Sequence, residues 1–142
     1  MPSDFLLKTV GGFHEWLLKV SKGKIAGNLQ GMPVLQLTTT GRKSGQPRHT
    51  MLTSPLQDGD KLMVVASRGG DDKHPAWFLN LRDQPKVEVT MEGKTRPMTA
   101  HIADAAEKAE LWPRIIADHK NYAGYQKKTD RDIPVVILEP AL

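Results

Sequence analysis

The sequence of 142 residues contains no cysteine. This absence excludes disulfide bonds, thiolate-ligated zinc or iron–sulfur centres and a cysteine nucleophile, and it is typical of a reducing compartment. Long apolar runs are also absent: no run approaches the ~20 residues of a membrane span, and the N-terminus lacks the apolar core and cleavage site of a signal peptide. We therefore expect a cytoplasmic protein, and a chain of this length should form one compact domain.

Several common catalytic motifs are missing as well. The sequence has no G-x-S-x-G elbow, no phosphate loop ending in Gly-Lys-Ser/Thr and no G-x-G-x-x-G after a predicted strand. Its five histidines are scattered, without H-x-H or H-E-x-x-H spacing, so no metal site is expected. Hydrolysis through a protein nucleophile or a metal ion is therefore disfavoured.

Acidic residues are lacking from one long stretch of a chain whose net charge is +4. Between Trp16 and Gln57 there is neither Asp nor Glu. A positive excess confined to one segment indicates a site for an anion, although a solvated basic face would give the same pattern. The cations of this segment are Lys19, Lys22, Lys24, Arg42, Lys43 and Arg48.

The first 30 residues have the pattern of a basic amphipathic helix followed by a glycine-containing linker. Apolar residues from Leu6 to Val20 recur at helical spacing, with lysines around them. Such a helix most often packs on its own domain, but it can also lie in a membrane interface. We assign 1–30 to this helix and linker and 31–142 to the main domain, and peripheral membrane contact on the inner face stays open.

From Pro33 onward the pattern changes to strands. The glycine-containing turns GRKSGQP and DGD favour hairpins, and together they predict a three-strand meander. Pro55 implies an edge or a bulge in the second of these strands. The strands of the expected meander cover residues 33–40, 48–57 and 61–67.

The second half of the chain alternates between helix and strand patterns. Asp104 and Glu107 match a capping box, so a helix should begin there and run to about His119, with Pro113 near its start or kinking it. About six antiparallel strands with peripheral helices predict an α+β protein, a small β-barrel. The other expected elements are a short helix at 76–83, strands at 86–92 and 95–102, and a buried strand at 133–140.

The segment GRKSGQPR (41–48) is the best candidate for binding an anion. Its two glycines would let backbone N–H groups converge, and Arg42, Lys43, Ser44 and Arg48 add charge and donors. This chemistry suits a phosphate or carboxylates, although basic turns are also common on surfaces.

Three segments together resemble one known family. LTTTGRKSGQPR (37–48), VVASRGGDDKHPAWFLNL (64–81) and YAGYQKKTDRDIPVVIL (122–138) are similar to the deazaflavin-dependent nitroreductases of actinobacteria, which are split β-barrel reductases that use coenzyme F-420. The resemblance runs from about Gly31 to Pro140. It implies a fold like that of the FMN-binding split barrels and a pocket for a reduced 8-hydroxy-5-deazaflavin, whose tail carries a phosphodiester and glutamate.

The resemblance also implies which residues contact the coenzyme. Arg42, Lys43 and Arg48 would neutralise the anionic tail, with backbone donors from Ser44 to Gln46. Trp77 could instead be an ordinary core residue. The remaining expected cofactor-binding residues are Thr38, Thr40, Gly45, Pro47, Met51, Ala66, Ser67, Arg68, Gly69, Gly70, His74 and Pro75.

The chemistry implied by the resemblance is hydride transfer from the reduced deazaflavin to an electron-poor acceptor. Quinones, enones and other activated C=C bonds, and nitroaromatics qualify. Negative charge develops on the acceptor, which calls for a nearby donor. By resemblance the candidates are Ser67, Tyr122 and Tyr125, although either tyrosine could be a half-buried surface aromatic.

The chain departs from the best-known nitroreductase of that family at two tyrosine positions. His119 stands at one of them and Thr53 or Ser54 at the other. Because these aromatics line the acceptor pocket, quinones and activated C=C bonds are safer expectations than nitroimidazoles.

The sequence offers less support for two other functions. Nucleic-acid binding is not expected, because only three cations cluster and no base-stacking aromatics accompany them. A split barrel that binds flavin mononucleotide or another large ligand, as an oxidase or a carrier, remains open because one fold hosts many functions.

Overall fold

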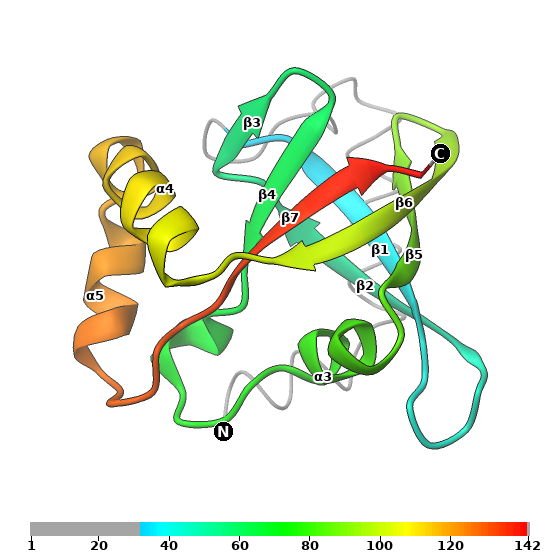
Figure 1. Ribbon diagram of the computed structural model, residues 1–142, viewed down its shortest axis with the longest axis horizontal. Helices are drawn as coiled ribbons and strands as arrows, with labels where there is room; N and C mark the ends of the chain where they lie inside the picture. Colours follow the sequence, from blue (N-terminus) through cyan, green and yellow to red (C-terminus); the bar gives the residue numbers. More distant parts are fainter. Residues whose placement is uncertain (1–31, 142) are drawn as a thin grey trace.

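The computed structural model describes residues 32–141. The predicted N-terminal helix and its membrane contact lie outside this range. The described chain forms one curled sheet of seven strands in the order β2-β1-β5-β6-β7-β4-β3, with every neighbouring pair antiparallel (Figure 1). The strands are β1 (Val34–Thr40), β2 (Pro47–Thr53), β3 (Leu56–Asp58), β4 (Lys61–Val65), β5 (Lys86–Met91), β6 (Lys94–Ile102) and β7 (Val135–Pro140).

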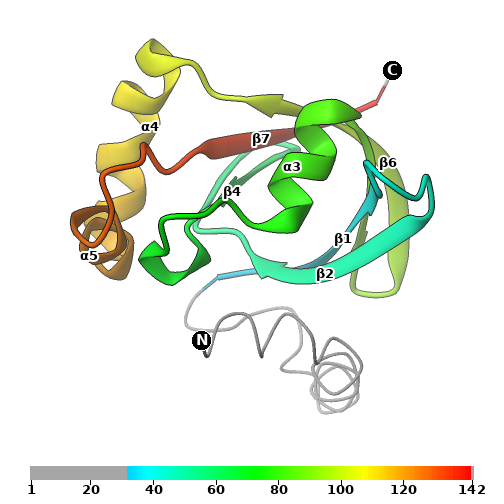
Figure 2. The ribbon, with the colours of Figure 1, turned by 90° about the horizontal axis from the view of Figure 1, so that it is seen from below.

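Helices lie at two places around this sheet. Helix α3 lies across the mouth of the curled sheet, whereas α4 and α5 lie together beside β4 and β7 (Figures 1 and 2). This arrangement confirms the predicted α+β class with a mostly antiparallel sheet. The helical elements are η1 (Arg68–Gly70), α3 (Ala76–Asp83), α4 (Ala105–Asp118) and α5 (Asn121–Lys127).

Local sequence signals account for most helix boundaries. Asp104 and Glu107 form the predicted capping box, each side chain accepting a hydrogen bond from the other residue's backbone N–H. Pro113 lies inside α4, which continues to Asp118. Helix α5 was not predicted, because seven residues with an internal Gly124 make a weak helix that depends on tertiary packing.

The predicted three-strand meander is wrong. The segment 48–57 is not one strand: it breaks into β2 and β3, which stand at opposite ends of the strand order. The break occurs at Ser54 and Pro55. The buried Ser54 hydroxyl lies 2.9 Å from the carbonyl oxygen of Leu56 and 2.7 Å from that of Met63. Proline also supplies no N–H to a ladder, so the chain turns a corner here instead of extending the hairpin.

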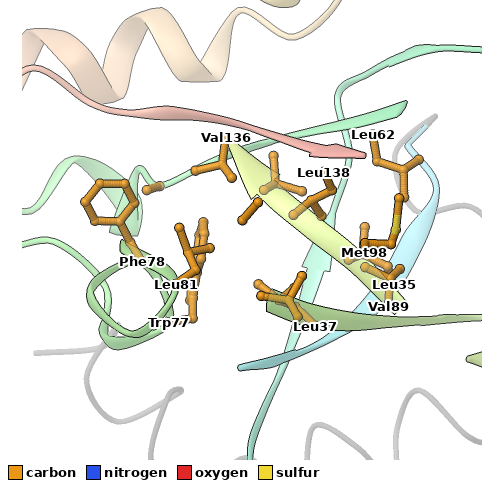
Figure 3. Packing of buried hydrophobic residues seen from close by; sticks show 14 residues of the cluster. Leu35, Leu37, Leu62, Trp77, Phe78, Leu81, Val89, Met98, Val136 and Leu138 are labelled. Carbon is orange, nitrogen blue, oxygen red and sulfur yellow. The ribbon is translucent and has the colours of Figure 1, made fainter. Parts of the chain in front are cut away.

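Residues of β4 and β7 are buried on both faces, and residues 32–141 form two hydrophobic cores. Alternate side chains point into the curled sheet or toward α4 and α5, and Figure 3 shows the inner set. The inner core comprises Leu35, Leu37, Leu62, Val64, Ala66, Trp77, Phe78, Leu81, Val87, Val89, Met98, Ala100, Val136 and Leu138. The outer core comprises Met32, Met63, Val65, Leu111, Ile115, Tyr122, Ile133, Val135 and Ile137.

Helix α3 closes the inner core and also faces the turn between β1 and β2. Its Trp77, Phe78 and Leu81 are buried against the sheet. Asn80 is buried on the same helix, with 4% of its surface exposed. A buried amide needs hydrogen-bond partners, and these partners fix the turn.

Candidate functional site

A cavity of about 510 Å³ lies between the β1–β2 turn, the first half of β2 and α3. We call it the turn cavity. Its walls bring together six of the residues predicted to bind an anionic cofactor, while Asn80, Thr39 and Thr50 also line it. The six predicted residues are Arg42, Lys43, Ser44, Pro47, Arg48 and Trp77.

The side chain of Asn80 holds the turn in place. Its Oδ1 accepts hydrogen bonds from the backbone N–H and from Nη1 of Arg42, both at 3.2 Å. Its Nδ2 donates to Oγ1 of the buried Thr39 at 3.1 Å. Asn80 was not among the predicted site residues, although an amide among the apolar residues of the predicted 76–83 helix was a usable signal. It orients one of the three cations of the turn cavity.

The backbone of the turn is largely satisfied by its own atoms. The N–H of Gly41 donates to the carbonyl of Gln46, and that of Gly45 donates to the carbonyl of Gly41, both at 2.8 Å. The N–H of Gln46 donates to the Ser44 hydroxyl at 3.2 Å. The backbone donors expected at Gly45 and Gln46 are therefore engaged within the turn, and an anion would be held mainly by side chains.

Glycine suits two positions of the turn for different structural reasons. Gly45 has a φ of +72°, a left-handed conformation that favours glycine. At Gly41 a Cβ would lie 2.7 Å from the Ser44 hydroxyl oxygen and 3.2 Å from the carbonyl oxygen of Gln46, so a side chain there would displace these groups. The turn thus brings its polar groups closer together than other residues would allow.

The three cations of the turn cavity have no acidic partner within residues 32–141. Arg42 is held by Asn80, and Nη2 of Arg48 lies 3.4 Å from the Ser44 hydroxyl. All three side chains are exposed. Uncompensated positive charge at a cavity mouth attracts anions.

A second cavity of about 230 Å³ lies where β2 approaches the segment after β4 and helix α5. We call it the tyrosine cavity. It brings together Met51, Ser67 and Tyr122, all predicted site residues, and Thr53 also lines it. The rest of its wall is formed by Val34, Leu52 and Val65.

Tyr122 is a buried member of the outer core rather than a surface aromatic. Burial raises the pKa of its phenol above the ordinary value, and a hydrogen bond with the Thr53 side chain opposes this effect. Its hydroxyl lies 3.7 Å from the sulfur of Met32. At neutral pH Tyr122 therefore retains a proton that it can donate.

Tyr125 lines neither the turn cavity nor the tyrosine cavity. Its ring packs edge-on against the ring of Tyr122, with centroids 5.9 Å apart, and Nζ of Lys128 lies 5.7 Å from its centroid. Among the two tyrosines, the structure places Tyr122 at the cavity and Tyr125 behind it.

Thr38 and Thr40 lie on the other face of β1 from Thr39. They line a separate cavity of about 310 Å³ with Lys86 and Glu88. Thr39 lines the turn cavity on the inner face, although it also reaches this second space. Because strand side chains alternate, the residue between the two predicted threonines is the one that reaches the turn cavity.

The loop between β4 and α3 carries the remaining predicted residues. Ala66 and Ser67 are buried, and Pro75 precedes the first turn of α3. Arg68 has a φ of +47°, and its guanidinium lies 3.8 Å from the Asp71 carboxylate, an ion pair within the loop. Gly69 and Gly70 complete η1.

Arg131 binds this loop from the segment between α5 and β7. Its Nε donates to the carbonyl of Asp71 at 2.7 Å, and its Nη2 donates to the carbonyls of Ala66 and Ser67 at 3.1 and 2.9 Å. Its Nη1 lies 3.1 Å from Nδ1 of His74. Arg131 stands within YAGYQKKTDRDIPVVIL (122–138), but no local pattern distinguishes it from the other charged residues of that segment.

Within residues 32–141, no group of three or more His, Asp or Glu side chains could hold a metal ion. No helix within the same range combines the length and the apolar character needed to span a bilayer.

Comparisons with known proteins agree on one family. The family model described as F420H2-dependent quinone reductase, F420H2 being reduced coenzyme F-420, matches residues 12–140. An F420H2-dependent quinone reductase of Mycobacterium tuberculosis (Rv1261c in strain H37Rv) is 39% identical over 132 residues, which cover 88% of this chain and 86% of the relative.

Solved structures share the fold, and one of them is an F420H2-dependent reductase. An F420H2-dependent reductase, FDR-A, is 42% identical with a TM-score of 0.66, covering 75% of this chain and 94% of its own. A structure described as a domain-swapped dimer is 35% identical with a TM-score of 0.68, covering 98% of this chain and 100% of its own. The heme storage protein HutZ of Vibrio cholerae, 20% identical with a TM-score of 0.56 and coverages of 77% and 82%, shares the fold alone.

Proposed function

Because the chain belongs to the F420H2-dependent quinone reductase family, we propose that it reduces quinone-like acceptors with reduced coenzyme F-420 as the hydride donor. The family match confirms the enzyme class and the coenzyme predicted from the sequence motifs. The curled sheet and the match to FDR-A confirm the split-barrel fold. The observation that carries the site is the turn cavity, where three cations with no acidic partner among residues 32–141 surround a space of about 510 Å³.

The residues of the turn cavity fit the anionic tail of the coenzyme. Arg42 and Arg48 would provide guanidinium contacts to phosphate or carboxylate, and Lys43 a third, more mobile charge. The hydrogen bonds from Arg42 to Asn80 hold one guanidinium before the ligand arrives, which reduces the entropy lost on binding. The engaged amides of the turn make its shape fixed rather than adaptable.

Strand β2 connects the turn cavity with the tyrosine cavity. Its residues from Pro47 to Thr50 line the turn cavity, and those from Met51 to Thr53 line the tyrosine cavity. An elongated ligand with its anionic end at the turn could therefore reach toward the tyrosine cavity along one strand. We place the acceptor in the tyrosine cavity.

The chain's own contribution to the reaction would be positioning, water exclusion and proton supply. When bound, the reduced deazaflavin supplies the hydride. The apolar side chains of Val34, Leu52 and Val65 exclude water from the tyrosine cavity. Tyr122 and Ser67 line the same space, and their hydroxyls would donate to an acceptor oxygen on which negative charge develops.

A flat, weakly polar acceptor suits these walls. Quinones fit the combination of apolar sides and two hydroxyl donors, and we extend the proposal to enones, other activated C=C bonds and nitroaromatics, which share an electron-poor π system. Neither His119 nor Thr53 adds an aromatic wall to the tyrosine cavity. We therefore expect quinones to be reduced faster than nitroaromatics.

A fluorescence titration followed by turnover tests the proposal. Coenzyme F-420 fluorescence should change saturably on addition of micromolar protein, and oxidation of the reduced coenzyme should follow addition of a soluble quinone. No change in fluorescence with the well-folded protein would contradict the proposal. A purified yellow protein with a bound flavin spectrum would favour a flavin-dependent oxidase or carrier instead.

A further inference from the structure

The Arg131 side chain joins two parts of the site that are far apart in sequence. All three guanidinium nitrogens are used, on the carbonyls of Ala66, Ser67 and Asp71 and on the ring of His74. Satisfying this many acceptors requires the planar fork of arginine, which a single ammonium group cannot reproduce.

The contact with His74 fixes which nitrogen of the imidazole carries the proton. Arginine has only donors and stays protonated, so Nδ1 of His74 must accept the hydrogen bond at 3.1 Å. The imidazole is then neutral, with its proton on Nε2. Burial and the neighbouring cations Arg131 and Arg82 also lower the pKa of His74. Burial lowers the pKa of Arg131 as well, and the carboxylates of Asp71 and Asp72 oppose that shift.

Further contacts tie the same two segments together. The Thr129 hydroxyl donates to the Asp72 carboxylate at 2.6 Å, and the backbone N–H of Arg131 lies 3.3 Å from the Thr129 hydroxyl oxygen. Gly70 packs so closely that a Cβ there would lie 2.8 Å from the carbonyl oxygen of Tyr125. The loop that carries Ser67 is thus fastened to the segment that carries Tyr122.

We propose that Arg131 is a positioning residue for the reductase reaction: it fixes the Ala66–Ser67 backbone against the α5 segment and holds His74 as the neutral Nε2–H tautomer. The inference rests on the proposed function, because Ser67 and Tyr122 are its proposed donors. If Arg131 has this role, Ser67 and Tyr122 keep one position relative to each other at the tyrosine cavity. His74 in turn offers a ligand a hydrogen-bond donor rather than an acceptor.

The first test needs no coenzyme. Nitrogen and carbon NMR shifts of histidine-labelled wild-type protein should give His74 the Nε2–H signature, with His74→Gln identifying its signals. In Arg131→Lys the signature should change toward a mixture of tautomers. An Nδ1–H signature in the wild type would overturn the inference, whether or not any variant folds, and so would an unchanged signature in Arg131→Lys.

The second test separates positioning from coenzyme binding. Arg131→Lys should lower kcat with a soluble quinone by about 10- to 100-fold, as expected for a misplacement on the order of 1 Å, with less than about a threefold change in the coenzyme dissociation constant. Arg114→Lys, which alters an exposed arginine of α4, is the matched control and should change neither quantity.

The two tests also distinguish the inference from the proposed function. Wild-type kcat in Arg131→Lys, with an altered His74 signature, would overturn the positioning role. Failure of the wild-type protein to bind coenzyme F-420 would count against the proposed function, whereas the His74 signature of the free protein would still be decided by the first test.

Discussion

Two substitutions of Asn80 test separately how the shape and the charge of the turn cavity contribute to coenzyme binding. Asn80→Ala removes three hydrogen bonds, two from Arg42 and one to Thr39. Each is worth ~1 kcal/mol net, and the exposed Arg42 can rebind water, so we expect a loss of about 2 kcal/mol in the free energy of unfolding and a melting temperature lower by roughly 5–8 °C. Coenzyme affinity should fall by about 2- to 10-fold, because Arg42 must then be ordered on binding.

Asn80→Asp should keep the shape of the turn but change the charge of the turn cavity. A carboxylate can still accept both hydrogen bonds from Arg42, so the turn should keep its shape and much of its stability. The added negative charge would neutralise one of the three cations and repel the coenzyme tail. Like charges ~4 Å apart repel by about 1 kcal/mol even in water, so affinity should fall by at least about fivefold.

Thermal denaturation and coenzyme fluorescence titrations at low and high salt measure both effects. Salt should weaken binding less in Asn80→Asp than in the wild type, because fewer net charges are screened. Wild-type affinity and wild-type salt dependence in Asn80→Asp would refute the reasoning, since the anionic tail could not then lie beside Arg42.

Three further predictions concern other parts of the site. Replacing both Arg42 and Lys43 with Ala should raise the coenzyme dissociation constant by roughly tenfold or more at low salt, because two cations of the turn cavity are lost. The circular dichroism spectrum should be unchanged, because the fold loses only the hydrogen bond from the Arg42 guanidinium to Asn80, while the backbone N–H of Arg42 still donates to it; unchanged affinity would place the anion site elsewhere. Tyr122→Phe should lower quinone turnover by about 10- to 100-fold at unchanged coenzyme affinity, as measured by steady-state kinetics, because the phenol donates to the developing oxyanion; equal turnover would remove that role. Folding lowers the pKa of His74, so below its ordinary pKa of about 6.5 the unfolded chain binds more protons than the folded chain. The free energy of unfolding should therefore fall as the pH drops through about 6.5 and level off below the folded-state pKa. Urea midpoints between pH 7.5 and 5.5 should show this loss in the wild type and less of it in His74→Gln, and equal slopes would contradict the assignment.

Local signals predicted the elements whose stability is local. The capping box of α4, the short helix at 76–83 and the hairpin turn before β4 all depend on residues adjacent in sequence, and the structure contains each of them. The break at Ser54 depends instead on a hydroxyl that reaches the carbonyl of Met63 on another strand. No pattern within 48–57 encodes that partner, which is why the meander was wrong.

Some residues of the candidate site could likewise be predicted from the sequence, whereas others could not. The cations of GRKSGQPR could be identified from charge alone, and the structure gathers them around one cavity. Choosing Thr39 over Thr38 and Thr40 required knowing which face of β1 points inward, because a shift of one residue reverses every side chain. The roles of Asn80 and Arg131 depend on partners that are distant in sequence, 38 residues away for Arg42 and 65 for Ala66, so only the fold reveals them.

The binding of coenzyme F-420 at two salt concentrations, by the wild type and by the variant lacking both Arg42 and Lys43, tests the proposed function and its site together. We expect saturable binding at micromolar wild-type protein, weaker at ~0.3 M than at ~0.05 M salt, because the Debye length shortens from about 14 to about 6 Å. The variant should bind more weakly and depend less on salt. Absence of binding by the wild type, or identical binding curves for the two proteins, would contradict the assignment of the turn cavity to the coenzyme tail.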